Sequence, residues 1–544
     1  MTAGVGSRKA DRLDFVVVGL LVVIGALQCV FCQAGTAFYS GDTSYLELAR
    51  SIIARRPYGF DFRAETMLPP GFPALLALLQ LAVGESHLRL VRAMVIVTTV
   101  AFFVTYLLLR RAYGRRTAGG ICLVLASSAG FFRFASTLVF SDMPYFLASM
   151  CALLVAAQLD RARTTSRRMV LFCLAALVIG ASLLIRTSGI ALVVGIVVWI
   201  AATFWFNRAR GVVRLKTFGG LVVCGMLMQL AWSNWATAQR VDEWPVGGYP
   251  RSYLEQLAVR NGNEPELGWA TLADIPGRIA QNIADRSAAL DDLTTGHAGS
   301  RLFAVRWFLP WILGPVVLIV IGLVRSIRRS GGTLAEWYFI VHEGIYLLWP
   351  WDFEIRFFLP VAPLACLYAW RGAHGCLTVV RRRWKWPSLG VRHTMEAVTL
   401  ALLGVLIAKG LVHQIGVARQ NRAFEVSKET NNSDIIAAQW IHAHVPSNAV
   451  IMARQWDVAY HYADRRVVWF PPSTDADLLL DGIVKHHVDF VVVVTRGKQT
   501  YWRPDDDRCF QSLVVRYPER FVIVQTGDRE KVYAVVHPES QDAS

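Results

Sequence analysis

The chain has 544 residues, of which 54% are hydrophobic and 18% are charged, and its mean hydropathy is +0.39. Soluble domains carry roughly 25% charged residues, so this composition excludes a soluble enzyme and predicts a multi-spanning membrane protein. A net charge of +16 would raise the question of nucleic-acid binding in a soluble chain. Here the arginines gather in short linkers between apolar segments, as at residues 110–116 and 161–168, which is typical of cytoplasmic loops in membrane proteins.

Apolar segments of about 18 residues or more are long enough to cross a hydrocarbon core roughly 30 Å thick. The segment at residues 72–83 is apolar but too short to span, so we expect a re-entrant or interfacial helix there. Counting it as a span would move every later arginine linker to the opposite side of the membrane. We therefore predict eleven spans, at residues 15–34, 87–109, 117–134, 138–159, 169–185, 188–206, 218–237, 302–324, 334–351, 357–370 and 394–412.

This arrangement of spans also predicts an orientation. If the N-terminus is cytoplasmic, every arginine-rich linker falls inside. Two large loops, 35–86 and 239–301, and everything after residue 412 then lie outside. We expect a multi-pass protein of the cell membrane (inner or plasma membrane), with a cytoplasmic N-terminus and an extracytoplasmic C-terminal domain.

The composition after residue 431 is that of a small soluble α/β domain. Helical patterns alternate with short β-branched segments, and no Walker loop, GxGxxG or nucleophile-elbow motif appears. The predicted fold class is thus an α-helical polytopic membrane protein, with a transmembrane domain at 1–416 and a C-terminal α/β soluble domain at 417–544. The helices are expected at 435–444 and 475–486, and the strands at 449–453, 466–470, 488–495, 521–526 and 532–536.

Several unusual polar residues lie at the predicted outer face. Asp42 follows Gly41 just after the first span, and Asp142 opens the fourth span. Each aspartate also fits the simpler role of a helix N-cap, which is the favoured interpretation for Asp142. Arg186 and Arg356 lie at the outer ends of later spans, where an arginine can also reach the lipid headgroups without a specific function.

The predicted topology gathers these charges on one face of the membrane. An arginine matches the geometry of phosphate oxygens, and a carboxylate can take a proton from a hydroxyl group, so the set suits a reaction on a phosphorylated lipid. His342 and Glu343 lie inside the ninth span, where we interpret them as a cavity-lining or helix-packing pair and not as a zinc signature. The gathered residues are Asp42, Asp142, Arg186, Asp352, Glu354 and Arg356.

In order and sidedness, these landmarks resemble the GT-C superfamily of integral membrane glycosyltransferases, especially aminoarabinose transferases and protein O-mannosyltransferases. The shared motifs are Asp-x-x-Tyr-x-x-x-Ala after the first span, Pro-Pro-x-x-Pro, an acidic residue that opens a span, and Arg-aromatic-x-Leu-Pro-x-x-Pro. The resemblance covers about residues 15–370. The chain carries these motifs in Asp42, Tyr45, Ala49, Pro69, Pro70, Pro73, Asp142, Arg356, Phe357, Leu359, Pro360 and Pro363.

The resemblance implies transfer of a sugar from a polyprenyl-phosphate donor to an acceptor hydroxyl on the outer side, by a single inverting displacement. The expected partners are this donor, a lipid, glycan or protein acceptor, and membrane lipids, but not nucleic acid. We expect no cofactor, because Thr43 stands where many relatives carry a second carboxylate for a metal ion. The implied roles are catalysis for Asp42 and Asp142, binding of the donor phosphate for Arg186, Arg356 and Arg63, and lining of the substrate groove for Tyr45, Glu354 and His342.

Two other functions stay open. A flippase for lipid-linked saccharides would also need many spans and cationic cavity residues, but it has no need of the large outer loop that carries Asp42, and internal repeats are absent here. A non-enzymatic envelope protein would use the spans as an anchor, and eleven spans exceed what an anchor requires.

Overall fold

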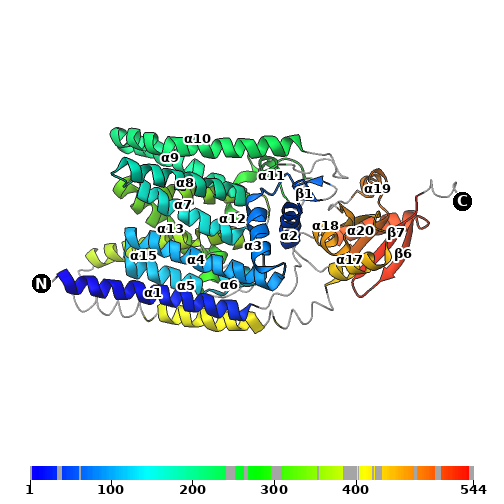
Figure 1. Cartoon of the computed structure of the whole chain (residues 1–544), viewed down its shortest axis with the longest axis horizontal. Helices are drawn as coiled ribbons and strands as arrows, with labels where there is room; N and C mark the ends of the chain where they lie inside the picture. Colours follow the sequence, from blue (N-terminus) through cyan, green and yellow to red (C-terminus); the bar gives the residue numbers. More distant parts are fainter. Residues whose placement is uncertain are drawn as a thin grey trace.

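The computed structural model describes residues 3–32, 40–60, 63–239, 252–262, 267–295, 309–351, 355–383, 401, 403–419, 422, 432–470, 475–495 and 504–537. Long helices run roughly side by side, and a C-terminal sheet with its own helices lies beyond one end of them (Figure 1). We call this end of the helical body the sheet end. The opposite end, where α1 begins, is the basic end.

Among the described residues, six helices are long and apolar enough to cross a membrane. The pair α5 (Arg115–Ala126) and α6 (Ala129–Thr137), bent by 55°, forms a seventh span if it is counted as one. The remaining predicted spans correspond to α13 (Leu309–Ser330), α14 (Leu334–Leu347), α15 (Ala362–Arg383) and the helical residues 403–419, which lie outside this count, so the number eleven stays a prediction. The six helices are α1 (Ala3–Phe31), α4 (His87–Tyr113), α7 (Asp142–Leu159), α8 (Thr165–Ile185), α9 (Ile190–Phe206) and α10 (Arg208–Ala238).

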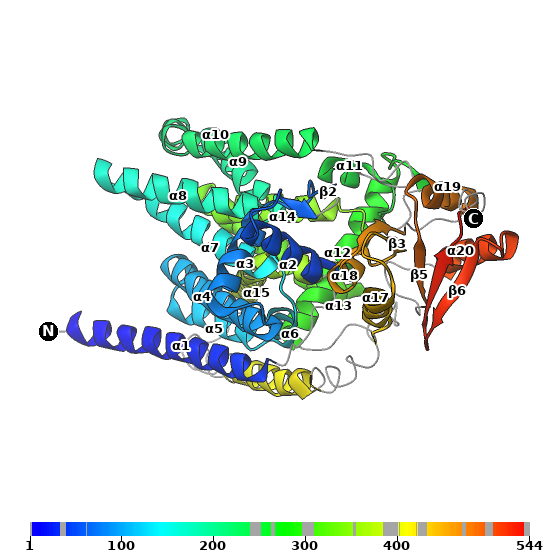
Figure 2. The same cartoon turned by 45° about the vertical axis from the view of Figure 1, so that its right-hand side comes forward.

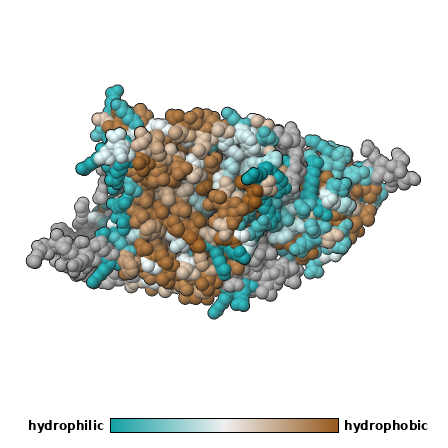
Figure 3. Space-filling model, viewed as in Figure 1, coloured by the Kyte–Doolittle hydropathy of each residue, from teal (hydrophilic) through white to brown (hydrophobic). Residues whose placement is uncertain are grey.

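The surface of these helices is apolar along most of their length. Large apolar side chains point outward, for example Phe15, Leu177 and Leu227, which are 81%, 69% and 61% exposed. Figure 3 shows hydrophobic residues over the middle of the helical body and hydrophilic residues toward both ends. A soluble protein rarely exposes a continuous apolar area of this kind, whereas lipid tails would cover it. The chain is a multi-pass membrane protein, as its composition predicted.

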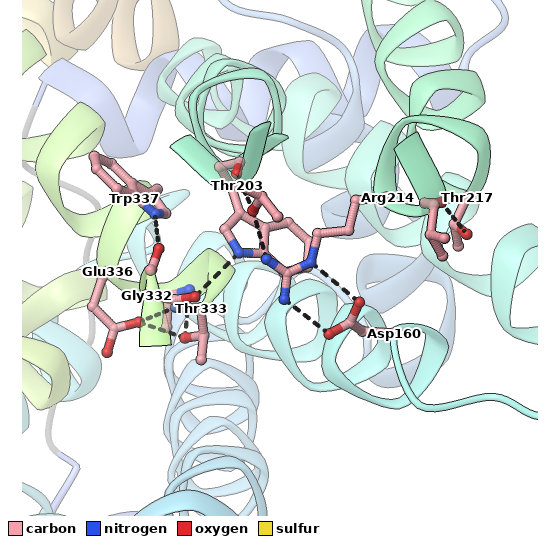
Figure 4. A network of polar contacts seen from close by, with 12 residues as sticks. Asp160, Thr203, Arg214, Thr217, Gly332, Thr333, Glu336 and Trp337 are labelled. Carbon is pink, nitrogen blue, oxygen red and sulfur yellow. Dashed lines mark hydrogen bonds and ion pairs between the residues drawn. The ribbon is translucent and has the colours of Figure 1, made fainter. Parts of the chain in front are cut away.

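The basic end holds the arginine linkers. Asp14 of α1 pairs with Arg110 at 2.9 Å and with Arg115 at 3.0 Å. Arg214 of α10, only 4% exposed, donates to both carboxylate oxygens of Asp160 after α7, at 3.3 and 3.2 Å (Figure 4). A buried arginine needs such a bidentate partner. These contacts tie several helices together at the basic end.

At the sheet end, short elements cover the helices. They are α2 (Ser40–Ile53), β1 (Gly59–Phe60), β2 (Arg63–Ala64) and α3 (Gly71–Val83). The apolar helix α3 has 13 residues, which confirms a short helix where the sequence predicted one. Its first residue is Gly71, where a Cβ would lie 2.6 Å from the backbone of Leu184. Only glycine permits this close approach of α3 to the end of α8.

The C-terminal elements form a five-stranded sheet with strand order β4-β3-β5-β7-β6. Strand β3 pairs in parallel with β4 and β5, and β7 is antiparallel to β5 and β6. The predicted helices and strands of this part are confirmed, whereas α18 and α20 were not predicted, and the division at residues 416 and 417 stays a prediction. The elements are α17 (Ser433–His444), β3 (Val450–Ala453), α18 (Trp456–Ala463), β4 (Arg466–Trp469), α19 (Ala476–Lys485), β5 (Phe490–Val494), α20 (Pro504–Arg516), β6 (Phe521–Thr526) and β7 (Glu530–Val535).

Candidate functional site at the sheet end

Asp42 lies in the first turn of α2 and is completely buried. Its Oδ1 accepts the backbone N–H of Val139 at 2.5 Å, and its Oδ2 lies 3.6 Å from Nε2 of His87. The alternative in which Asp42 caps a helix beginning at Thr43 is wrong, because α2 begins at Ser40 and the carboxylate bonds to a distant segment. The acidic side chain thus joins α2 to the segment that precedes α7.

The neighbouring glycine makes this junction possible. A Cβ on Gly41 would lie 2.5 Å from the ring of Phe140. The small residue therefore lets α2 approach the segment 139–141 closely enough for Asp42 to reach the amide of Val139. The glycine and the aspartate act together in placing the carboxylate.

Asp142 is the first residue of α7, and the N-cap position belongs to Ser141. The N-cap interpretation of Asp142 is therefore wrong by one residue, although a carboxylate in the first turn still faces the positive end of the helix dipole. Its Oδ1 accepts a hydrogen bond from Nη1 of Arg186 at 2.6 Å, and the same nitrogen donates to Oγ of Ser141 at 3.2 Å. Arg186, expected at the headgroups if it had no specific function, instead forms an ion pair with a buried carboxylate.

Tyr45 stands one turn beyond Asp42 on α2. Its hydroxyl group lies 3.1 Å from Oγ of Ser141, and its ring packs edge-on against Phe72 of α3 at 4.7 Å. Burial raises the pKa of Tyr45 above its ordinary value, against the opposing effect of Arg186. The tyrosine is therefore neutral at physiological pH and offers a hydroxyl beside the Asp142–Arg186 pair.

Arg356 completes the cationic part of the site. It lies in the 3-10 turn η4 (Ile355–Phe357), with its guanidinium carbon 4.8 Å from the ring centre of Phe140 and 5.0 Å from that of Phe357. The guanidinium of Arg186 lies 5.2 Å from the same Phe357 ring. Two arginines thus share one aromatic ring, and one carboxylate, Asp142, lies against one of them.

His342 packs against Tyr346, which in turn packs against Phe357. It is 1% exposed, and Nδ1 is 3.3 Å from Oε1 of Glu343, whose other oxygen pairs with Arg286 at 2.6 Å. Arg286 comes from α12 (Asp274–Thr295). Tyr346 stacks on Phe357 at 5.1 Å and lies 5.0 Å from the His342 ring. These contacts favour the helix-packing interpretation of His342 over the cavity-lining one.

Of the two remaining predicted site residues, the structure describes only Arg63, and it lies elsewhere. Arg63 lies with its guanidinium 4.1 Å above the ring of Trp456 and 5.5 Å from that of Phe60, which places it at the contact with α18. Glu354, like Asp352, lies outside the described residues. The structure therefore brings Asp142, Arg186, Arg356 and Tyr45 together. Asp42 lies next to this group, because it binds the backbone N–H of Val139 in the segment that precedes α7.

The sequence analysis missed His87, Phe140 and Ser141. The signal for His87 was its place at the outer end of the second predicted span, directly after the short apolar helix. Nothing in the sequence singles out Phe140 or Ser141, because their importance depends on the approach of α2. Within the described part of the chain, no group of three or more His, Cys, Asp or Glu side chains is placed to bind a metal ion.

No protein-family model and no curated protein matches the chain. Solved structures do match. One is the oligosaccharyltransferase AglB of Archaeoglobus fulgidus in complex with an inhibitory peptide and a dolichol-phosphate, with 15% identity, a TM-score of 0.55, and coverage of 88% of this chain and 69% of that chain. Another is ArnT of Cupriavidus metallidurans bound to undecaprenyl phosphate, with 14% identity, a TM-score of 0.53, and coverage of 96% and 98%. The chain therefore has the fold of GT-C membrane glycosyltransferases.

Proposed function

We propose that the chain is a membrane glycosyltransferase that moves a sugar from a polyprenyl-phosphate donor to an acceptor hydroxyl at the sheet end. The observation that carries the proposal is the pair of arginines, Arg186 and Arg356, which both lie against the ring of Phe357 and close to two buried aspartates. The fold supports it, since AglB and ArnT were solved with dolichol-phosphate and undecaprenyl phosphate.

The arginines would bind the phosphate of the donor. A guanidinium donates two parallel hydrogen bonds to phosphate oxygens, and positive charge next to the leaving group stabilises the charge that develops as the glycosidic C–O bond breaks. Asp142 holds Arg186 at 2.6 Å, so this guanidinium is already oriented before a donor arrives. The proposed phosphate site is therefore built from Arg356 and the Asp142-held Arg186, and Arg63 stays a prediction for that role.

Asp42 would act as the general base for the acceptor hydroxyl. As the acceptor oxygen attacks the anomeric carbon, its proton passes to the Asp42 carboxylate, and the polyprenyl phosphate leaves from the opposite face of the sugar. One displacement of this kind inverts the anomeric centre. The proposed displacement uses no metal ion, since Thr43, and not a second carboxylate, follows Asp42.

The test is transfer by the purified, detergent-solubilised protein. It would be incubated with pentosyl and hexosyl polyprenyl phosphates, labelled in the sugar, and with lipid, glycan and peptide acceptors. We expect the label to move to an acceptor and polyprenyl phosphate to be released. Label that stays on the donor, while the protein moves the donor across a vesicle membrane, would instead identify a flippase.

A further inference from the structure

The side chain of His87 lies next to Asp42 and has no role in the transfer step described above. His87 opens α4, and its side chain is 6% exposed. Its Nε2 lies 3.6 Å from Oδ2 of Asp42, which is at ion-pair distance but beyond a hydrogen bond. In the part of the chain that the structure describes, the two imidazole nitrogens of His87 have no hydrogen-bond partner, and Oδ2 of Asp42 has none either. Two buried ionisable groups therefore face each other.

This arrangement has a physical consequence. A buried acceptor without a partner costs about 1–3 kcal/mol, and more when it carries charge. If Oδ2 of Asp42 and the imidazole N–H moved closer by less than an ångström, they would form a hydrogen bond that removes this cost. Catalytic hydrogen bonds are commonly long before substrate binds and shorten in the complex. The pair is thus placed to close onto a hydrogen bond.

The start of α4 is held in place independently of Asp42. Arg89 donates to the carbonyl of Val83 at 2.7 Å, and Arg92 donates to the carbonyl of Cys29 of α1 at 3.2 Å. The nearby carboxylate of Glu85 is paired with Arg50 of α2 at 3.1 Å. Within the described part of the chain, Asp42 is therefore the acidic group at ion-pair distance from His87, and the His87 ring lies on an anchored backbone.

We propose that His87 is a positioning residue for Asp42. The N–H of Val139 holds Oδ1 and the imidazole N–H holds Oδ2, so the carboxylate cannot rotate about its Cβ–Cγ bond. Each oxygen of an ionised carboxylate has two acceptor sites, so these two donors leave one site on each oxygen unused. The catalytic consequence rests on the proposed function, whereas the pairing of the two side chains does not.

The test compares His87→Phe, which keeps a flat ring without a donor, with His87→Gln, whose amide still donates. We expect His87→Phe to lower kcat at least tenfold while the donor KM changes less than threefold, and His87→Gln to recover most of that loss. His374→Phe, at an exposed position on α15, is the control and should transfer like the wild type. If kcat fell and the donor KM rose by the same factor, or if glutamine did not restore activity, the positioning role would be overturned.

A second measurement examines the pair without any transfer assay. The Tm shifts of Asp42→Ala, His87→Phe and the double variant should be non-additive, with the double variant shifting Tm by less than the sum of the single shifts. Additive shifts would overturn the pairing. If the shifts are non-additive but wild-type protein transfers no sugar, the proposed function has failed, and His87 is a structural partner of Asp42 only.

Discussion

At the scale of single residues, Asp42 separates chemistry from structure most sharply. Asparagine keeps an oxygen that accepts the N–H of Val139, so Asp42→Asn should insert and unfold like the wild type. It cannot accept a proton. If the carboxylate activates the acceptor, transfer should fall about a hundredfold or more, the usual scale for a lost general base. The measurement is transfer per folded molecule, with thermal unfolding of the same sample.

Two matched variants sharpen this comparison. Asp42→Ala leaves the buried amide of Val139 without its acceptor and should also lose about 1–3 kcal/mol of stability. Asp160→Asn makes the same carboxylate-to-amide change at the basic end, where Asp160 binds Arg214. It should lower stability and leave transfer per folded molecule intact. Near-normal transfer by Asp42→Asn would remove Asp42 from catalysis and make Asp142 the next residue to test.

Arg356 is the residue that tests binding of the donor. Its guanidinium lies between aromatic rings, and Arg356→Ala should cost one charge-assisted contact to phosphate, about 1.5–3 kcal/mol or roughly tenfold to a hundredfold in donor affinity or turnover. Lysine should rescue only partly, because it lacks the planar fork. Donor titrations of the three proteins would measure this.

The control for Arg356 lies at the other end of the helical body. Arg371 also stacks on an aromatic ring, that of Tyr113, at 4.9 Å, and Arg371→Ala should leave use of the donor unchanged. Glutamine at position 356 makes no ionic contact with phosphate. Full activity of Arg356→Gln would show that Arg356 supports the fold rather than the donor.

At the scale of elements, the packing of α2 against α18 links the site to the C-terminal sheet (Figure 2). Ser44 donates to Oδ2 of Asp457 at 2.6 Å, and Nδ1 of His461 lies 2.6 Å from Oε1 of Glu47. Leu48, on the same helix, belongs to the apolar core that the C-terminal strands share. The helix that carries Asp42 is therefore held from the side of the sheet.

This contact predicts that a change in α18 affects transfer at a distance. Asp457 is 1% exposed, and Asp457→Ala would leave Ser44 without its acceptor, lowering stability by about 1–3 kcal/mol and lowering transfer because α2 shifts. Asp457→Asn keeps an acceptor and should have a clearly smaller effect on both. Thermal unfolding and transfer of the two variants provide the comparison. Equal, wild-type behaviour of both would show that α18 does not hold α2.

The elements also show what a sequence can predict. Long apolar helices and the alternating helices and strands of the C-terminal part repeat a clear pattern over many residues, and the structure contains both, whereas the number of spans stays a prediction. Helix α18 has only eight residues and forms against α2, so its own pattern was too short to identify it. The same holds for the site. The charges at the ends of spans were recognised, but the Asp142–Arg186 and Asp42–His87 pairings depend on the register between helices, which one sequence does not encode in any local pattern.

At the scale of the whole molecule, the arginine linkers and the C-terminal sheet lie at opposite ends of an apolar helical body (Figures 1 and 3). Positively charged loops stay on the cytoplasmic side during insertion. The proposed orientation follows, with the basic end in the cytoplasm and with Asp42, the arginines of the site and the C-terminal sheet outside. A donor carried on a polyprenyl chain would then meet the acceptor outside the cell membrane.

Reporter fusions test this orientation. A reporter joined after Arg115, at the start of α5, and one joined after Ser447, between α17 and β3, should report opposite sides, the first cytoplasmic and the second extracytoplasmic. A fusion after Arg163, between α7 and α8, is the matched control and should agree with the fusion after Arg115, since two membrane crossings separate them. If the fusions after Arg115 and Ser447 reported the same side, an odd number of spans between them would be excluded. One of the helices between the two fusions, for example one of the four later helices outside the count of six, would then not cross the membrane. The C-terminal sheet would lie on the same side as the linker after Arg115, and the site would lose its extracytoplasmic acceptor.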